Sequence, residues 1–328
     1  MMKIYVYLDA AMGDNLYLYA ACRAIKMLTH ADITLVSSPL FVPLAHACPH
    51  FSAVWQADAL TPSQCQTLQQ AHAQGRFIDF TCWDHALRPV HMIDNFLAQA
   101  GLSAKECDKQ LDLVLPEEAC KTIEAFYQQH NLDGKQVMLF HPNIGHPNRT
   151  WSQENWFALA EMWILSGWQV IFIGSNTNSE AAKTMAQTCP AGVINAIDAF
   201  SPLETIALMK RAQMLVSCDS GPVMLAAATD IRITALYSTV ASQHRLPFRH
   251  GEAGWNCLAI DLACTAGPCA RLMADKTIFT THLKRPFSEP TQQEFANWCV
   301  NSTAFKCLKH YHPATLYSKM AEFLLREE

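Results

Sequence analysis

The chain has 328 residues, of which 50% are apolar and 16% are charged, and its formal net charge is −5. This length favours two domains with separate cores, and the apolar content excludes long disordered segments. The negative charge argues against nucleic acid as a partner, because domains that bind nucleic acid carry a basic surface.

The sequence also predicts where the protein works. Asp9 and Asp14 interrupt the apolar N-terminal run, so we do not interpret it as a signal peptide. No apolar run reaches the roughly 20 residues that cross a bilayer. The 13 cysteines are an odd number and favour reduced thiols. We expect a cytoplasmic protein with at most peripheral membrane association, at the inner face of the inner membrane.

Short β-rich runs alternate with helical stretches in the first half of the chain. Strands are predicted at 3–8, 32–36, 76–80 and 111–116, and helices at 15–28, 41–48, 91–100 and 117–130. This alternation predicts βαβ units and a parallel sheet. The turn sequence Asn-Leu-Asp-Gly ends at Gly134, where we place the domain boundary.

The same alternation restarts in the second half. Strands are predicted at 136–140, 169–174, 214–219 and 233–237, and helices at 152–165, 179–188, 202–212, 222–229 and 313–325. The prediction is an α/β protein with two Rossmann-like domains, 1–134 and 135–328. Ligands of such sheets bind at the carboxyl ends of the strands, so the two domains are expected to face each other across a cleft.

The first motif, Gly13-Asp14, lies between the first strand and its helix. Asp14 has two interpretations. It is either an N-cap, a position that Asp fills well, or a carboxylate that projects into the cleft and acts as a general base.

The second motif, HPNIGHPNRTW at 141–151, leads from a strand into a helix. Its prolines, glycine and asparagines, including Asn143, predict an exposed loop at the sheet edge. Arg149 lies near a helix start, which is already positive, so an anionic group such as a diphosphate would suit the site. The alternative is a surface Arg with Trp151 packed beneath it.

The third motif, SCDSGPVMLAAA at 217–228, is again strand, turn and helix. Backbone N–H groups at Ser220 and Gly221 suit a phosphate, whereas the alternative is an ordinary capped turn. Gly174-Ser175 forms another polar turn at the same edge. Glu180 follows it, and is either a ligand of a ribose hydroxyl or a solvated helix residue.

Together these motifs resemble glycosyltransferase family 9, the bacterial heptosyltransferases. The three blocks appear in the family's order, with Gly-Asp after the first strand, then the His-Pro…Trp block and finally Asp-Ser-Gly-Pro. The resemblance covers both halves and implies the GT-B fold. This sequence departs from the family at Met224, where the family has His, and at Asn143, where it has a small residue.

The resemblance also implies site residues and a reaction. Asp14 would be the base and Arg149 would replace a phosphate-binding Lys. The expected reaction is inverting and metal-independent transfer of a sugar, most simply heptose from ADP-heptose, to a hydroxyl of a lipopolysaccharide core or related bacterial glycan. The first domain would hold the acceptor and the second the nucleotide sugar, with no further cofactor. The nucleotide-sugar site would comprise Gly13, Asn143, Gly174, Ser175, Glu180, Asp219, Ser220, Gly221, Pro222 and Met224.

Other interpretations stay open. The chain could be a non-catalytic sugar-nucleotide-binding protein of the same fold, or a sugar-nucleotide epimerase, which needs no acceptor. Arg76 and Arg88 are the cations expected at the cleft edge of the first domain, where they would bind the acceptor. Near the C-terminus, buried free thiols compete with a metal site at Cys264, Cys269, Cys299 and Cys307, whose spacing is looser than that of standard zinc sites.

Overall fold

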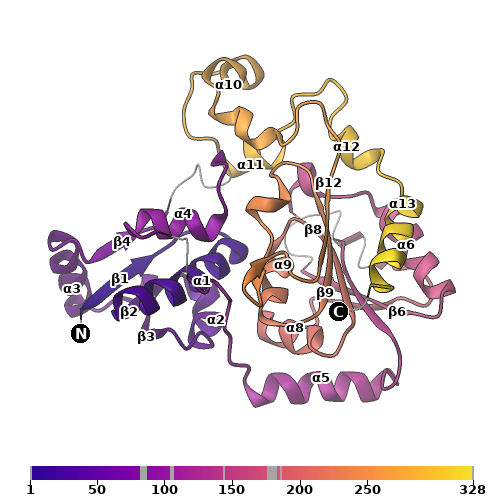
Figure 1. Ribbon diagram of the computed structural model, residues 1–328, viewed down its shortest axis with the longest axis horizontal. Helices are drawn as coiled ribbons and strands as arrows, with labels where there is room; N and C mark the ends of the chain where they lie inside the picture. Colours follow the sequence, from indigo (N-terminus) through magenta and orange to yellow (C-terminus); the bar gives the residue numbers. More distant parts are fainter. Residues whose placement is uncertain are drawn as a thin grey trace.

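The computed structural model describes residues 2–81, 87–103, 107–142, 145–175, 183–184 and 187–326. Figure 1 shows two α/β bodies, the first in indigo and purple and the second in magenta to yellow. A 4-stranded sheet forms the centre of the first body and a 6-stranded sheet that of the second. The predicted α/β class with two Rossmann-like halves is confirmed.

The first sheet has the strand order β3-β2-β1-β4, and its neighbouring strands are parallel. Strand β1 is an inner strand, and the middle of its short run KIYVY is buried, as expected for a parallel sheet. The elements of this half are β1 (Lys3–Tyr7), α1 (Met12–Thr29), β2 (Asp32–Ser37), η1 (Pro39–Phe41), α2 (Val42–His46), β3 (Phe51–Gln56), η2 (Ala57–Ala59), α3 (Pro62–Ala73), β4 (Phe77–Asp79) and α4 (Met92–Gln99).

The second sheet has the order β12-β9-β8-β5-β6-β7, with all neighbours parallel. Its elements are β5 (Val137–His141), η4 (Pro147–Arg149), α6 (Gln153–Leu165), β6 (Gln169–Gly174), β7 (Ile194–Ile197), α8 (Pro202–Met209), β8 (Met214–Cys218), α9 (Gly221–Leu225), η5 (Ala226–Ala228), β9 (Arg232–Tyr237), η6 (Ser242–His244) and β12 (Cys257–Asp261). This is the strand order of dinucleotide-binding folds. From β5 the chain first adds strands on one side (β6, β7) and then on the other (β8, β9, β12), so the order reverses between β5 and β8. The carboxyl ends of these two strands therefore mark the expected ligand crevice.

The remaining elements lie outside the two sheets. The antiparallel pair β10 (Phe248–Arg249) and β11 (Glu252–Ala253) follows β9. The C-terminal elements are η7 (Cys269–Ala274), α10 (Lys276–Leu283), α11 (Gln292–Ala296), α12 (Lys306–Lys309) and α13 (Pro313–Leu324). Helix α13 packs against α6 on the second body (Figure 1). No helix in the described ranges is both long enough and apolar enough to span a membrane.

One predicted strand is wrong. Residues 111–116 form no strand and pair with no strand in the described part of the chain. The backbone N–H of Val114 donates to the carbonyl of Ala47 at 2.8 Å, which ties this segment to the end of α2 and not to a sheet edge. The apolar residues here cover the first core while the chain crosses to the second body. Most of the helix predicted at 179–188 lies outside the described residues.

Helix α5 (Glu117–Gln129) follows this crossing and packs against α8 of the second body (Figure 1). The rings of Phe126 and Phe200 meet edge to face, with centroids 5.0 Å apart. The guanidinium of Arg211 lies 3.9 Å from the ring centroid of Tyr127. The boundary after Gly134 stays a prediction, and this packing favours a division before Glu117.

The two bodies also touch through helices. Helix α1 of the first body packs against α9 of the second. Leu16 and Val223, one on each helix, belong to a single buried cluster. The start of α1 therefore lies beside the start of α9, at the carboxyl edges of both sheets.

Candidate active site

His141, at the carboxyl end of β5, joins the second motif to the third motif and to the turn after β6. Its Nδ1 lies 3.2 Å from the hydroxyl oxygens of both Ser217 and Ser220. The two hydroxyls are 2.9 Å apart. Burial lowers the pKa of His141 to about 4, so the ring is neutral at pH 7. Sequence reasoning did not select His141 as a site residue, although it opens the second motif.

Gly174 meets the other side of the same ring. Its φ is +131°, and a Cβ built there would lie 2.9 Å from Cδ2 and 3.2 Å from Nε2 of His141. A side chain would thus displace the imidazole. The predicted turn after β6 is therefore brought to the second and third motifs by close packing against His141.

Arg149 and Asp219 meet at the crevice. Nη1 of Arg149 lies 3.4 Å from Oδ2 and 3.3 Å from the carbonyl oxygen of Asp219. Two hydrogen bonds fix the loop that carries Arg149. Nδ2 of Asn148 donates to the carbonyl of Phe295 at 2.6 Å, and the hydroxyl of Ser238 donates to the carbonyl of Asn148 at 2.6 Å. The structure therefore aligns the predicted cation with the predicted diphosphate motif.

Two nitrogens of this loop are buried without a hydrogen-bond partner among the described residues. They are Nε of Arg149 and Nδ1 of His146. Burial and the Arg149 charge lower the pKa of His146 to about 4, against the opposing effect of Asp219. Buried polar atoms are usually satisfied, and Nε of Arg149 lies in the same guanidinium that faces Asp219. Trp151 is buried, as the alternative of a surface Arg packed on it also expects, so the diphosphate role of Arg149 stays a prediction.

Asp14 lies within the first turn of α1. The N-cap is Ala11, so the interpretation of Asp14 as the N-cap is wrong. A Cβ on Gly13 would lie 3.4 Å from Cα of Gly221, which shows how closely the two helix starts approach. The side chain of Asp14 is 30% exposed, which leaves it open to a substrate.

Arg245 faces Asp14 from the second body and was missed by sequence reasoning. Its Nη1 lies 3.8 Å from Oδ1 of Asp14, and its side chain is 9% exposed. Burial lowers its pKa, but the carboxylates of Asp219 and Asp14 outweigh burial and raise it overall. The only signal in the sequence was a basic residue in the loop after β9, at the same edge as Asp219.

Other residues predicted for the nucleotide-sugar site lie around this cluster or outside the described part. Asn143 and Glu180 lie outside the described residues. Ser175 directly follows Gly174 at the sheet edge. Pro222 is the second residue of α9, and Met224 is only 2% exposed within the core. The binding role of these residues stays a prediction.

The two predicted acceptor cations are separated by the fold. Nη1 of Arg76 donates to the carbonyl of Lys3 at 3.3 Å, at the amino end of β1. The expected place of Arg76 at the cleft edge is therefore wrong, because it precedes β4 whereas the crevice lies where strands end. Nη1 of Arg88, which precedes α4, donates to Oδ1 of Asn95 on that helix at 2.8 Å. The N-cap residue of α4, His91, bonds to the carbonyl of Leu246 in the second body.

The C-terminal cysteines approach one another but do not form a recognisable metal centre. In the described ranges, no group of three or more His, Cys, Asp or Glu residues is arranged to hold a metal ion. Nδ2 of Asn301 lies 3.3 Å from Sγ of Cys264 and 3.9 Å from Sγ of Cys299. Burial, together with the three neighbouring thiols, raises the pKa of Cys269 to about 12. We derive no step of the reaction through a metal here.

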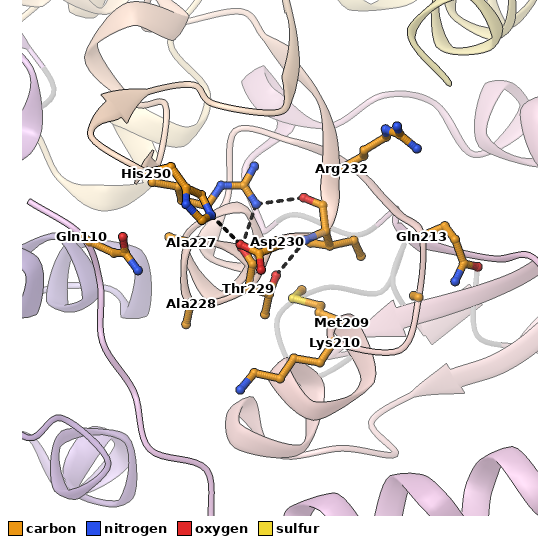
Figure 2. Close-up of a pocket in the computed structure, with 13 residues that line it drawn as sticks. Gln110, Met209, Lys210, Gln213, Ala227, Ala228, Thr229, Asp230, Arg232 and His250 are labelled. Atoms are coloured by element: carbon orange, nitrogen blue, oxygen red, sulfur yellow. Dashed lines mark hydrogen bonds and ion pairs between the residues drawn. The ribbon is translucent and has the colours of Figure 1, made fainter. Parts of the chain in front are cut away.

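A separate cavity of about 670 Å³ lies at the opposite edge of the second sheet (Figure 2). It is lined by Thr229, Asp230 and Arg232 at the amino end of β9, and by His250, whose Nε2 lies 2.7 Å from Oδ1 of Asp230. These residues precede strand β9, whereas Asp219 follows strand β8. The cavity is therefore distinct from the crevice.

Comparisons with known proteins identify the family of the chain. The family model described as glycosyltransferase family 9 (heptosyltransferase) matches residues 59–260. Lipooligosaccharide heptosyltransferase 2 of Haemophilus influenzae is 26% identical over 140 residues, which are 41% of this chain and 40% of that protein. The match thus spans less than half of that relative.

Solved structures share the fold along the whole chain. A glycosyltransferase family 9 protein from Veillonella parvula superposes with a TM-score of 0.73 at 15% identity, over 99% of this chain and 98% of that one. The E. coli ADP-heptose lipopolysaccharide heptosyltransferase II gives 0.64 at 15% identity, over 99% of both chains. The iron-containing dodecameric E. coli glycosyltransferase TibC gives 0.69 at 13% identity, over 98% of this chain and 76% of that one. These neighbours have the predicted GT-B fold. Since the family model covers more than half of its residues, the chain belongs to glycosyltransferase family 9.

Proposed function

We propose that this protein transfers a heptose from ADP-heptose to a hydroxyl of a lipopolysaccharide core or related bacterial glycan. The observation that carries the proposal is the guanidinium of Arg149, whose Nη1 lies 3.4 Å from Oδ2 of Asp219 at the crevice between β5 and β8. A guanidinium in this position would suit a diphosphate. The names of the H. influenzae and E. coli relatives support heptose and ADP-heptose as the sugar and its donor.

In the proposed reaction, Asp14 accepts the proton of the acceptor hydroxyl as its oxygen attacks the anomeric carbon. The bond from that carbon to the diphosphate oxygen breaks on the opposite face, so the configuration inverts. Arg149 and the backbone N–H groups at the start of α9 stabilise the charge that develops on the leaving diphosphate. The neutral ring of His141 holds Ser220 in place at that helix start.

The acceptor is proposed to bind on the first body. Arg88 is the cation we retain for it, because it precedes α4 and bonds to Asn95 of that helix, whose N-cap residue His91 bonds to Leu246 of the second body. Arg76 is not carried into the proposed acceptor site. We also propose a cytoplasmic location, because the sequence has an odd number of cysteines. We further propose that the reaction needs no resident cofactor. Measuring activity after exhaustive dialysis against a chelator tests this.

The test combines binding with turnover. Calorimetry with ADP, UDP and GDP should show the strongest binding for ADP. Mixing the protein with ADP-heptose and lipopolysaccharide from a heptose-deficient strain should release ADP and add one heptose mass to the acceptor. Binding to none of the three nucleotides would refute the proposal. Binding without release would favour the non-catalytic alternative, and conversion of the donor without acceptor would favour the epimerase.

A further inference from the structure

The segment 242–246 is bonded firmly to the second sheet. Oδ1 of Asp261, at the end of β12, accepts from the backbone N–H of Ser242 at 2.8 Å, and Oδ2 accepts from its hydroxyl at 2.6 Å. The backbone N–H groups of Arg245 and Leu246 donate to the carbonyl of Ser242 at 2.8 and 2.9 Å. The backbone of Arg245 is therefore held in place by the second body.

The first body bonds the same segment from the other side. The hydroxyl of Tyr17, on α1, donates to the carbonyl of Arg245. Nε2 of His91 donates to the carbonyl of Leu246 at 2.8 Å, while its Nδ1 accepts from the backbone of Ile93. Burial lowers the pKa of His91 and favours this neutral form. Two side chains of the first body thus hold successive carbonyls of the second.

The side chain of Arg245 in turn contacts the first body. Its guanidinium lies 5.8 Å from the ring centroid of Tyr17 and its Nη1 lies 3.8 Å from Oδ1 of Asp14. A buried cation is costly unless carboxylates face it, and here Asp219 and Asp14 both do. A residue that only filled space between the bodies would not need a charge. The arrangement suits a cation that orients a carboxylate.

We propose that Arg245 is a positioning residue that holds the carboxylate of Asp14 from the opposite body. The base would then be aligned only when the two bodies are in contact through segment 242–246. This inference rests on the proposed function, to which it adds a residue and a role. Without the guanidinium, Asp14 would be free to change rotamer, and a misplacement of about 1 Å can cost as much as 10²-fold in rate.

The test compares Arg245→Gln and Arg245→Lys with wild type, by kcat and KM for ADP-heptose, ADP affinity by calorimetry, and thermal midpoint. Arg245→Gln should lower kcat by roughly 10- to 100-fold, with ADP affinity and donor KM within about 3-fold of wild type. Arg245→Lys should recover part of the loss, since it restores the charge but not the planar group. The matched control is Arg211→Gln, an exposed arginine of the same body, which should keep wild-type kcat.

The outcomes separate this inference from the proposed function. Wild-type kcat in Arg245→Gln would overturn the inference alone. A parallel loss of ADP affinity would also overturn it, because Arg245 would then act on the nucleotide and not on Asp14. If the Gln variant does not fold, Arg245→Lys decides by the same two measurements. A wild-type protein that binds ADP-heptose but never releases ADP would overturn both.

Discussion

Gly174→Ala tests the packing that joins the motifs of the crevice. The φ of +131° at Gly174 is one that L-residues rarely adopt. The new Cβ would also lie 2.9 Å from Cδ2 of His141, a distance that requires the ring to move. Because the ring is buried and bonded to Ser217 and Ser220, it cannot move without losing those contacts.

The expected loss of stability follows from these two effects. Holding a non-glycine residue in a sparsely populated backbone region costs about 1 to 3 kcal/mol. Loss of the contacts between His141 and the two hydroxyls adds about 1 to 3 kcal/mol, at roughly 0.5 to 1.5 kcal/mol for each hydrogen bond. We therefore expect Gly174→Ala to lower the free energy of unfolding by about 2 to 6 kcal/mol.

Urea denaturation followed by tryptophan fluorescence measures this loss. Gly167→Ala is the matched control, because Gly167 has a φ of +86° but nothing within 4 Å of its added Cβ, so it should cost only the backbone effect of about 1 to 2 kcal/mol. In a double-mutant cycle, His141→Ala should remove the clash and make Gly174→Ala less costly. Equal losses at the two glycines, with additive behaviour in the cycle, would refute the reasoning.

Three further predictions concern individual side chains. Asp14→Asn should keep the fold and ADP binding but lower kcat by roughly 10²- to 10⁴-fold, and wild-type turnover would remove Asp14 from the mechanism. Arg149→Ala should weaken ADP binding by about 1.5 to 3 kcal/mol by calorimetry, with partial recovery in Arg149→Lys, and unchanged affinity would place the diphosphate elsewhere. The pKa of His141 is lowered to about 4, so the unfolded chain binds its proton first, and stability present above pH 6.5 is lost as the pH falls towards 4. That loss is about 3 kcal/mol at 1.36 kcal/mol per pH unit, and His141→Gln should remove it from the pH dependence of urea midpoints.

The sequence alone predicted the fold class and most of its elements. Short apolar runs such as KIYVY and QVIFIG, separated by amphipathic stretches, carry the period and spacing of parallel βα units. These signals depend on residues a few positions apart in the sequence, so they can be interpreted without knowledge of tertiary contacts. The three motifs were predictable for the same reason, because each lies where a strand ends and a helix begins.

Signals of this local kind failed where an element needed a distant partner. Residues 111–116 have the composition of a strand, but the fold offers them the end of α2 and no sheet edge. Arg76 looked like a cation near the cleft, although its position before a strand places it at the amino edge.

The composition of the site was decided by tertiary structure. Asp14 and Arg245 lie on different bodies, and only the packing of α1 against α9 brings their charges to 3.8 Å. Gly174 is required because the ring of His141, from another strand, fills the space where a side chain would lie. Sequence patterns report which residues end at a sheet edge. Which of them meet there depends on strand order and on contacts between bodies, because these set the distances over which hydrogen bonds and charges act.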